Sequence, residues 1–88
     1  MDIKDEVRQF IVKHFYVANP ASVSDEVSLL ETGVIDSTGV LEVIGFIEGT
    51  FGVHVDDDEM LPDNLDSIAR IAAYVARKRA GGTARGVG

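Results

Sequence analysis

The stretch of sequence that decides the fold lies in the middle of the chain, where residues 36–52 read DSTGVLEVIGFIEGTFG. Asp36 or Ser37 stands where a helix cap belongs, and Gly52 stands where a helix commonly ends. Between them, large apolar residues recur every three or four positions, which is the spacing of one helix face. These residues are Val40, Val43, Ile44, Ile47 and Phe51. The pattern predicts a helix over residues 37–51.

The segments before this helix predict a first helix followed by a long loop. Residues 3–16 show the same helical spacing, with Asp2 as a candidate cap. Asn19 and Pro20 then interrupt the pattern, and residues 17–36 have no sustained period. This loop nevertheless carries Val23, Val27, Leu29, Leu30, Val34 and Ile35. We therefore expect a loop that packs against the core.

The segments after the central helix predict a short turn and a closing helix. Residues 56–61 suit a single helical turn before Pro62, and Asn64 is a candidate cap for the closing helix. The apolar stripe of that helix is Leu65, Ile68, Ile71, Ala72 and Val75. Gly81 and Gly82 are expected to end it.

Length and composition support one small helical domain. The chain has 88 residues, of which 45% are hydrophobic and 26% are charged, so it has enough apolar residues to fold. We expect an all-α fold, a bundle of three or four helices over residues 1–80, with a long loop between the first two helices. Residues 81–88 are expected to form a flexible tail.

Composition also excludes several functions. Cysteine is absent, which excludes a disulfide framework and thiolate metal sites, and no other metal site is predicted. The net charge of −7 argues against binding to nucleic acid or to an anionic membrane. No apolar stretch has the length of a membrane span or of a signal-peptide core. We expect a cytoplasmic monomer.

The charges are segregated along the chain. Residues 31–66 carry ten acidic residues and no Lys or Arg, whereas the residues after 66 carry five bases and no acid. Such an acidic run is either an ordinary solvated face or a docking surface for basic partners.

Ser37 occupies a position that favours a bound anion, because the first turn of a helix presents free N–H groups and the positive end of its dipole. A phosphate ester on this serine would be stabilised there. From spacing alone, the simpler interpretation is that Ser37 or Asp36 caps the helix, and both interpretations stay open.

The span of residues 3–79 resembles the acyl carrier protein family, which includes peptidyl and aminoacyl carrier proteins. Residues 33–37, GVIDS, are similar to the family's loop that leads to its modified serine. Residues 42–53 are similar to its recognition helix and the turn that follows, and residues 64–75 to its closing helix.

The resemblance implies a carrier that is not itself an enzyme. Ser37 would bear 4′-phosphopantetheine, attached by a phosphopantetheinyl transferase, and the thiol of this arm would hold an acyl or aminoacyl group as a thioester. Asp36 would assist loading by helping the transferase bind its metal ion. An activating ligase and a downstream acyltransferase, synthase or modifying enzyme would be further partners. The residues that partners recognise would be Thr38, Leu41, Glu42, Glu48, Asp56, Asp57, Asp58 and Glu59.

Two features depart from the family's usual pattern. Thr38 follows the serine where Leu is usual, and Gly39, Gly45 and Gly49 lie in a helix that normally presents bulkier apolar residues. Both features are expected to reduce the apolar surface area near the arm. We therefore hypothesise a specialised carrier with a dedicated adenylate-forming ligase. The cargo, whether fatty acyl, aminoacyl, aryl or polyketide, stays open.

Two rival functions fail on the sequence, and one remains as the alternative. A serine hydrolase needs a base and an orienting group beside Ser37, but only His14 and His54 are present and the G-x-S-x-G elbow is missing. A calcium loop that starts at Asp56 lacks the required Gly and Glu. The remaining alternative is an unmodified acidic helical module that binds other proteins.

Overall fold

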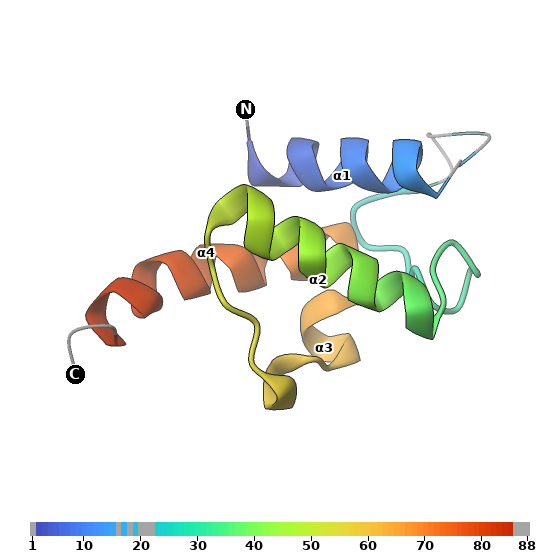
Figure 1. Ribbon diagram of the computed structural model, residues 1–88. Coiled ribbons are helices and arrows are strands. Elements are labelled where there is room, and N and C mark those ends of the chain that lie inside the picture. The colour runs from blue at the N-terminus through green and yellow to red at the C-terminus, as the bar shows by residue number, and fades with distance from the viewer. Residues whose placement is uncertain (1, 16, 18, 20–22, 86–88) are drawn as a thin grey trace.

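The computed structural model describes residues 2–15, 17, 19 and 23–85 of the chain (Figure 1). Its elements are α1 (Ile3–His14), α2 (Ser37–Phe51), the 3-10 turn η2 (Asp57–Glu59), α3 (Pro62–Leu65) and α4 (Ile68–Arg85). Every element in these ranges is helical, which confirms the predicted fold class. Helix α4 contacts α1, α2 and α3 and is therefore the common support of the bundle. None of these helices is long and apolar enough to cross a membrane.

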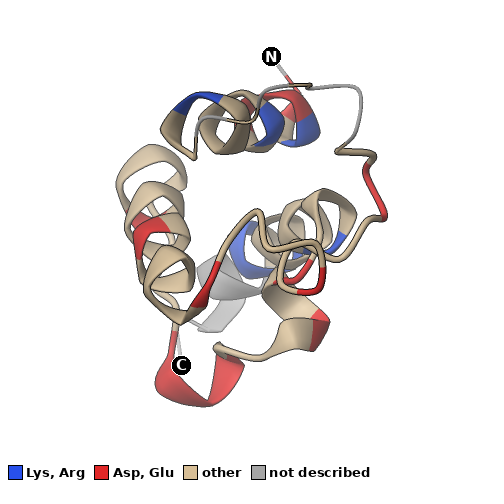
Figure 2. Cartoon of the chain, turned by 90° about the vertical axis from the view of Figure 1, so that its right-hand side faces the viewer, with Lys and Arg blue, Asp and Glu red and all other residues tan. Residues whose placement is uncertain are grey.

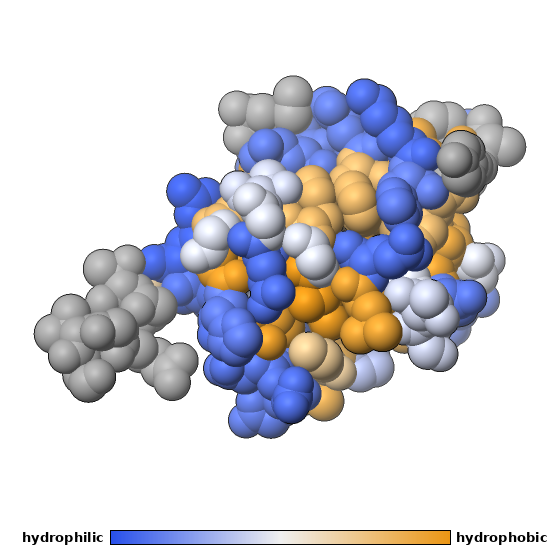
Figure 3. All heavy atoms as spheres, in the orientation of Figure 1, coloured by the Kyte–Doolittle hydropathy of each residue, from blue (hydrophilic) through white to orange (hydrophobic). Residues whose placement is uncertain are grey.

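The core lies between α1, α2 and α4, which surround it in the end-on view of Figure 2. Its fully buried members from these three helices are Val7, Ile11, Val43, Ile47, Ile68, Ile71, Tyr74 and Val75. Apolar residues also reach the surface in the middle of the face drawn in Figure 3, with hydrophilic residues around them. The interior accounts for the periodic stripes of the sequence, because each stripe faces the same core.

The long loop packs against the core, as predicted. Val23, Leu29 and Ile35 are buried. Asp66, just before α4, binds the loop on both its side chain and its backbone: the carboxylate accepts hydrogen bonds from the Ser28 hydroxyl (2.6 Å) and the Leu30 amide (3.0 Å), and the carbonyl accepts one from the Leu29 amide (2.7 Å). These bonds hold the part of the loop around Leu29, which leads to the start of α2, against the start of α4.

Both ends of α2 lie where the sequence predicts them. The carboxylate of Asp36 accepts a hydrogen bond from the Gly39 amide (2.7 Å), which is the geometry of an N-cap. Gly52 ends the helix in the left-handed conformation, with φ of +69°, and its amide donates to the Glu48 carbonyl (3.1 Å). The cap is thus Asp36, which leaves the side chain of Ser37 outside the capping contact.

The three glycines of α2 lie on two different faces, which corrects one expectation. Gly39 is buried, and a Cβ added there would approach the Phe15 ring to 3.0 Å and the Ile35 Cβ to 3.1 Å. Gly45 and Gly49 are exposed, and an added Cβ would meet nothing within 4 Å. The expected thinning of the outer face therefore applies to Gly45 and Gly49, whereas Gly39 permits a close approach of α1 and α2.

The start of the closing helix differs from the prediction. Pro62 begins the separate short helix α3, and α4 begins only at Ile68. Asn64 does not cap α4, because its side-chain amide donates to the Glu59 carbonyl (2.9 Å). The buried Ser67 takes the capping position instead, and its hydroxyl accepts from the Arg70 amide (3.1 Å).

Two other helix ends also differ. Helix α1 ends at His14 rather than at residue 16, and Asp2 stands at its N-cap position without a side-chain capping bond. Helix α4 passes through the glycine pair and ends at Arg85. Most of the predicted tail therefore belongs to this helix, and residues 86–88 lie outside the described residues.

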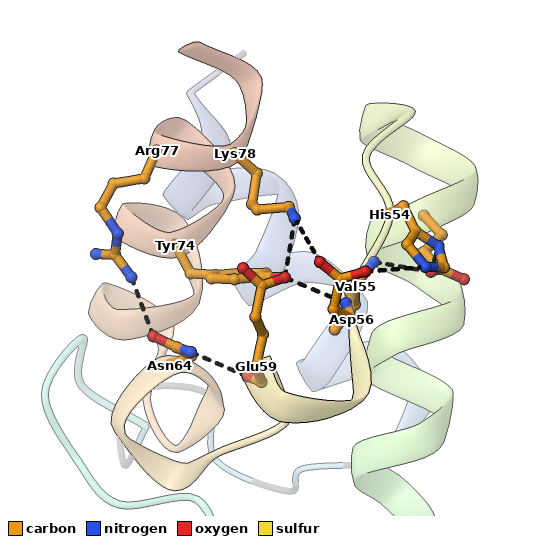
Figure 4. Close-up of polar contacts among 9 residues, drawn as sticks. His54, Val55, Asp56, Glu59, Asn64, Tyr74, Arg77 and Lys78 are labelled. Carbon is orange, nitrogen blue, oxygen red and sulfur yellow. Dashed lines mark hydrogen bonds and ion pairs between the residues drawn. The ribbon is translucent and has the colours of Figure 1, made fainter. Parts of the chain in front are cut away.

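A polar cluster connects η2 to α4 (Figure 4). One carboxylate oxygen of Glu59 accepts hydrogen bonds from the Tyr74 hydroxyl (2.9 Å) and the Lys78 ammonium (2.8 Å). We call Glu59, Tyr74 and Lys78 the Glu59 clamp. The hydrogen bond from Lys78 lowers the pKa of Glu59 from its ordinary 4.5 to about 2, against the opposing effect of burial. The folded protein therefore stabilises the ionised carboxylate.

The two classes of glycine predict opposite effects of alanine. Gly39→Ala should destabilise the protein by about 1–3 kcal/mol, because Phe15 and Ile35 must shift to admit the methyl group. Gly49→Ala, in the same helix but in open space, should stabilise it by roughly 0.5–1 kcal/mol. Urea unfolding followed by circular dichroism measures both. Equal effects of the two substitutions would contradict the packing of Gly39 against α1.

The Glu59 clamp predicts a dependence of stability on acid pH. Because the folded-state pKa of Glu59 is depressed, its contribution is complete above about 4.5 and is lost as pH falls toward about 2. At pH 7, Glu59→Gln should lower stability by about 1–2 kcal/mol. In thermal melts from neutral pH down to about 2, the difference in stability between the natural chain and Glu59→Gln should shrink. The exposed control Asp58→Asn should change the stability little at any pH in this range. A stability difference that stays constant across this pH range would show that the charge of Glu59 contributes nothing to the stability of the fold.

Candidate functional site

Ser37 is the first residue of α2, and its side chain is exposed. The residues around it explain this position. Ile35, two residues earlier, is only 2% exposed, and Gly39, two residues later, is buried against the side chains of Phe15 and Ile35. Asp36 supplies the cap, so the hydroxyl of Ser37 stays available at the positive end of the helix dipole. The site is an accessible nucleophile where negative charge is stabilised.

Ser37 also borders an apolar groove of about 350 Å³. We call it the Ser37 groove; its other lining residues are Leu30, Val40, Leu41, Met60, Leu61, Pro62 and Leu65. They come from the long loop, α2, the segment after η2, and α3. A group attached to Ser37 therefore has an apolar surface beside it.

The predicted recognition residues separate into two sets. Thr38, Leu41, Asp57 and Asp58 face solvent, and Leu41, one turn after Ser37, is 62% exposed. Leu41 lines the Ser37 groove together with the exposed Leu30 and Leu61, and such groups of exposed apolar side chains are typical of contact surfaces. This set lies on α2 and η2 and presents one large apolar residue and two carboxylates.

The other four acidic residues have partners within the protein. Glu42 binds the ring Nε2 of His14 (2.7 Å), and Glu48 accepts from the Val55 amide (2.9 Å). Asp56 and Glu59 form a capping box around η2. Their carboxylates are therefore already engaged, and any role in partner recognition stays a prediction.

The Glu59 clamp changes the ionisation of its other members as well. The hydrogen bond to Glu59 raises the pKa of Lys78, and the Asp56 carboxylate, 3.6 Å from the ammonium, adds to this effect. Burial, followed by the hydrogen bond to Glu59, raises the pKa of Tyr74. Lys78 therefore stays a cation and Tyr74 stays a neutral donor through the physiological range.

The two histidines lie in contacts that do not involve Ser37. His14 stacks on Phe10, with ring centroids 4.9 Å apart, besides its contact with Glu42. His54 lies 3.3 Å from Glu48 and from Asp56. Neither arrangement places a base beside the serine hydroxyl. Within the described part of the chain, no group of three His, Asp or Glu side chains is arranged to hold a metal ion.

The groove is the part of the site that sequence reasoning missed. Leu30, Met60, Leu61 and Pro62 belong to segments predicted as a loop or a turn, where periodicity gives no information. The available signal was Leu61, a large apolar residue beside Pro62 in a segment with no helical stripe. It is 48% exposed, which an ordinary core residue is not.

The residues present fit a phosphopantetheine group on Ser37. The hydroxyl is exposed for phosphodiester formation, and the start of α2 favours the phosphate charge. The groove beside it would offer apolar contact to a group carried on such an arm. The thiol at the end of such an arm would supply the sulfur that a chain without cysteine lacks.

Comparison with known proteins agrees with this geometry. The family model described as a phosphopantetheine attachment site matches residues 5–75. A D-alanyl carrier protein of Streptococcus sanguinis (strain SK36) is 32% identical over 79 residues, which cover 90% of this chain and 98% of that protein. An acyl carrier protein of Campylobacter hominis is 31% identical over 75 residues, which cover 85% and 91%.

A D-alanyl carrier protein of Streptococcus gordonii is similar too, with 30% identity over 79 residues, 90% of this chain and 98% of that protein. Because the matched family is defined by the attached group, the match favours a carrier over an unmodified interaction module. The chain therefore belongs to the acyl carrier protein family, whose members bear phosphopantetheine and carry groups for other enzymes without catalysing a reaction themselves.

Proposed function

We propose that Ser37 is the attachment site of the phosphopantetheine arm and that the protein presents an acyl or aminoacyl thioester to partner enzymes. The observation that supports this is the exposed hydroxyl at the first position of α2, bordered by the apolar Ser37 groove. The arm supplies a thiol that holds the cargo. The protein supplies a fixed origin for the arm and a surface that partners recognise.

Asp36 has two roles in this proposal. Its carboxylate caps α2 through the Gly39 amide, which fixes the first turn of the helix. The same carboxylate assists the transferase in holding its metal ion during loading. The two roles separate chemically, because asparagine caps a helix as well as aspartate does but has no charge to offer a cation.

The partners in this proposal are the loading transferase, an adenylate-forming ligase and a downstream acyltransferase, synthase or modifying enzyme, and the setting is a specialised biosynthetic pathway in the cytoplasm. The exposed set of Thr38, Leu41, Asp57 and Asp58 is the surface they would read first. Both D-alanyl and acyl carrier proteins are among the relatives, which supports an acyl or aminoacyl group as the cargo.

Ser37→Ala should abolish loading and leave the fold intact, because the side chain makes no capping contact. Intact-mass spectrometry after incubation with coenzyme A and a promiscuous phosphopantetheinyl transferase should show one added arm on the natural chain and none on the variant. Thr38→Ala, which removes the neighbouring exposed hydroxyl, should still gain one arm. An arm retained by the Ser37 variant, or lost from the Thr38 variant, would place the attachment elsewhere.

Asp36→Asn should slow loading by about ten-fold or more through weaker metal binding, yet leave the melting temperature nearly unchanged. Asp36→Ala removes the cap as well and should cost about 1 kcal/mol of stability. Initial loading rates at several Mg²⁺ concentrations, with a thermal melt of each variant, separate these effects. If the asparagine variant loads at the natural rate, Asp36 is a cap and nothing more.

A further inference from the structure

The segment on the outer side of the Ser37 groove has little apolar support. It consists of Met60, Leu61 and Pro62, which we call the outer wall. Leu61 is 48% exposed, Pro62 is exposed, and Met60 alone of the three packs against the core. The preceding turn η2 buries none of its residues. Apart from Met60 and the buried Leu65 at the end of α3, the position of this wall therefore depends on polar contacts.

Those contacts begin at Glu59, the residue directly before the outer wall. One oxygen of its carboxylate accepts from Tyr74 (2.9 Å), from Lys78 (2.8 Å) and from the Asp56 amide (3.1 Å). Lys78 is only 13% exposed, so its ammonium is well shielded from competing water. Charge-assisted bonds in such a setting are stronger and more directional than those at an open surface.

A second contact fixes the other end of the wall. The Asn64 side chain, two residues after Pro62, donates to the Glu59 carbonyl (2.9 Å) and accepts from the Arg77 guanidinium (3.0 Å). Both ends of the wall are thus tied to α4, as Figure 4 shows. The opposite side of the groove belongs to α2, which the core positions independently. Side chains of α4 therefore contribute to the separation of the two sides, together with the core packing of Met60 and Leu65.

We propose that the Glu59 clamp determines which cargo the groove accepts, by fixing the outer wall at a separation from α2 that suits a short apolar acyl chain. This inference rests on the proposed attachment of the arm to Ser37. The groove, about 350 Å³, is near the lower end of the roughly 300–1,000 Å³ of ligand pockets. Apart from the Ser37 hydroxyl its lining is apolar, so it offers no partner to a charged cargo. A long chain enters only if the wall moves and clamp contacts break.

Acyl groups of different length on the same arm test this directly. A promiscuous transferase loads the protein from acetyl-, hexanoyl- or dodecanoyl-coenzyme A, and the rate at which hydroxylamine cleaves each thioester is measured. In the natural chain the hexanoyl form should be cleaved about five-fold more slowly than the other two, an effect as large as burial of little more than one methylene group. Equal rates for hexanoyl and dodecanoyl forms would overturn the proposal.

Two variants break the clamp in different ways. Glu59→Gln removes its charge, and Lys78→Met removes its cation while the capping box of Asp56 and Glu59 stays intact. In both, the ratio of dodecanoyl to hexanoyl cleavage rates should fall below about two-fold, because a displaced wall no longer distinguishes the chains. All rates are measured at a temperature where circular dichroism shows each variant folded.

Two controls separate the clamp from general effects. Asp63→Asn removes one charge from α3, where its side chain is 90% exposed, and Arg8→Gln removes the contacts that bind α1 to Val23 and Asp25 of the loop. Both should keep the natural ratio. An Arg8 variant that loses the ratio as fully as the Lys78 variant would assign the effect to stability in general, and the proposal would be wrong.

Intact mass distinguishes the two proposals. If the natural chain gains no acyl-phosphopantetheine while a known carrier does, the attachment to Ser37 is wrong and the clamp has no cargo to select. If every variant gains the mass and all show the natural ratio, the attachment stands and the clamp proposal is overturned.

Discussion

The position of Ser37 depends on one close approach, where Gly39 of α2 lies against the ring of Phe15 at the end of α1. A Cβ at residue 39 would come to 3.0 Å from that ring, so the absence of a side chain at Gly39 allows Phe15 to lie this close to α2. In a helix each residue turns about 100° from the last, so a position two residues before a buried one points away from the contact. The exposure of the Ser37 hydroxyl therefore follows from the burial of Gly39, and the Asp36 cap makes it the first helical residue.

Two kinds of force shape the site, and they act on opposite sides of the groove. The α2 side is positioned by apolar burial, which is not directional and depends little on pH. The outer wall is positioned by the Glu59 clamp, whose hydrogen bonds require particular atoms at particular angles. The first arrangement gives a rigid origin for an attached arm. The hydrogen bonds of the Glu59 clamp give the groove an outer wall whose position can change when a single side chain is substituted.

Local sequence signals, such as caps and apolar periodicity, predict a helix correctly where they agree with one another. They fail where a tertiary contact engages the predicted cap. The bounds of helix α2 are predicted correctly because the two candidate caps, Asp36 and Ser37, are adjacent and Gly52 marks the other end. Before α4 the predicted cap, Asn64, is wrong, because its side chain contacts the Glu59 carbonyl and Ser67 caps the helix instead. The attachment serine is predicted through the family resemblance. The groove and the clamp are not, because Glu59 and Lys78 are far apart in sequence and no periodicity relates them.

The three-dimensional arrangement also changes how the acidic residues between 31 and 66 are interpreted. The bases of α4 return to it in space: Lys78 binds Glu59 and Asp56, and Arg70 lies 3.7 Å from Asp63. In Figure 2 the acidic residues of η2 lie at the edge of the molecule, where Asp57 and Asp58 face solvent. A charge that already has a close partner adds little to the field felt by an approaching protein, whereas an unshielded carboxylate contributes fully. The attraction of a basic partner therefore comes from fewer carboxylates than the sequence contains, and those of Asp57 and Asp58 lie two or three residues from the wall that borders the proposed arm.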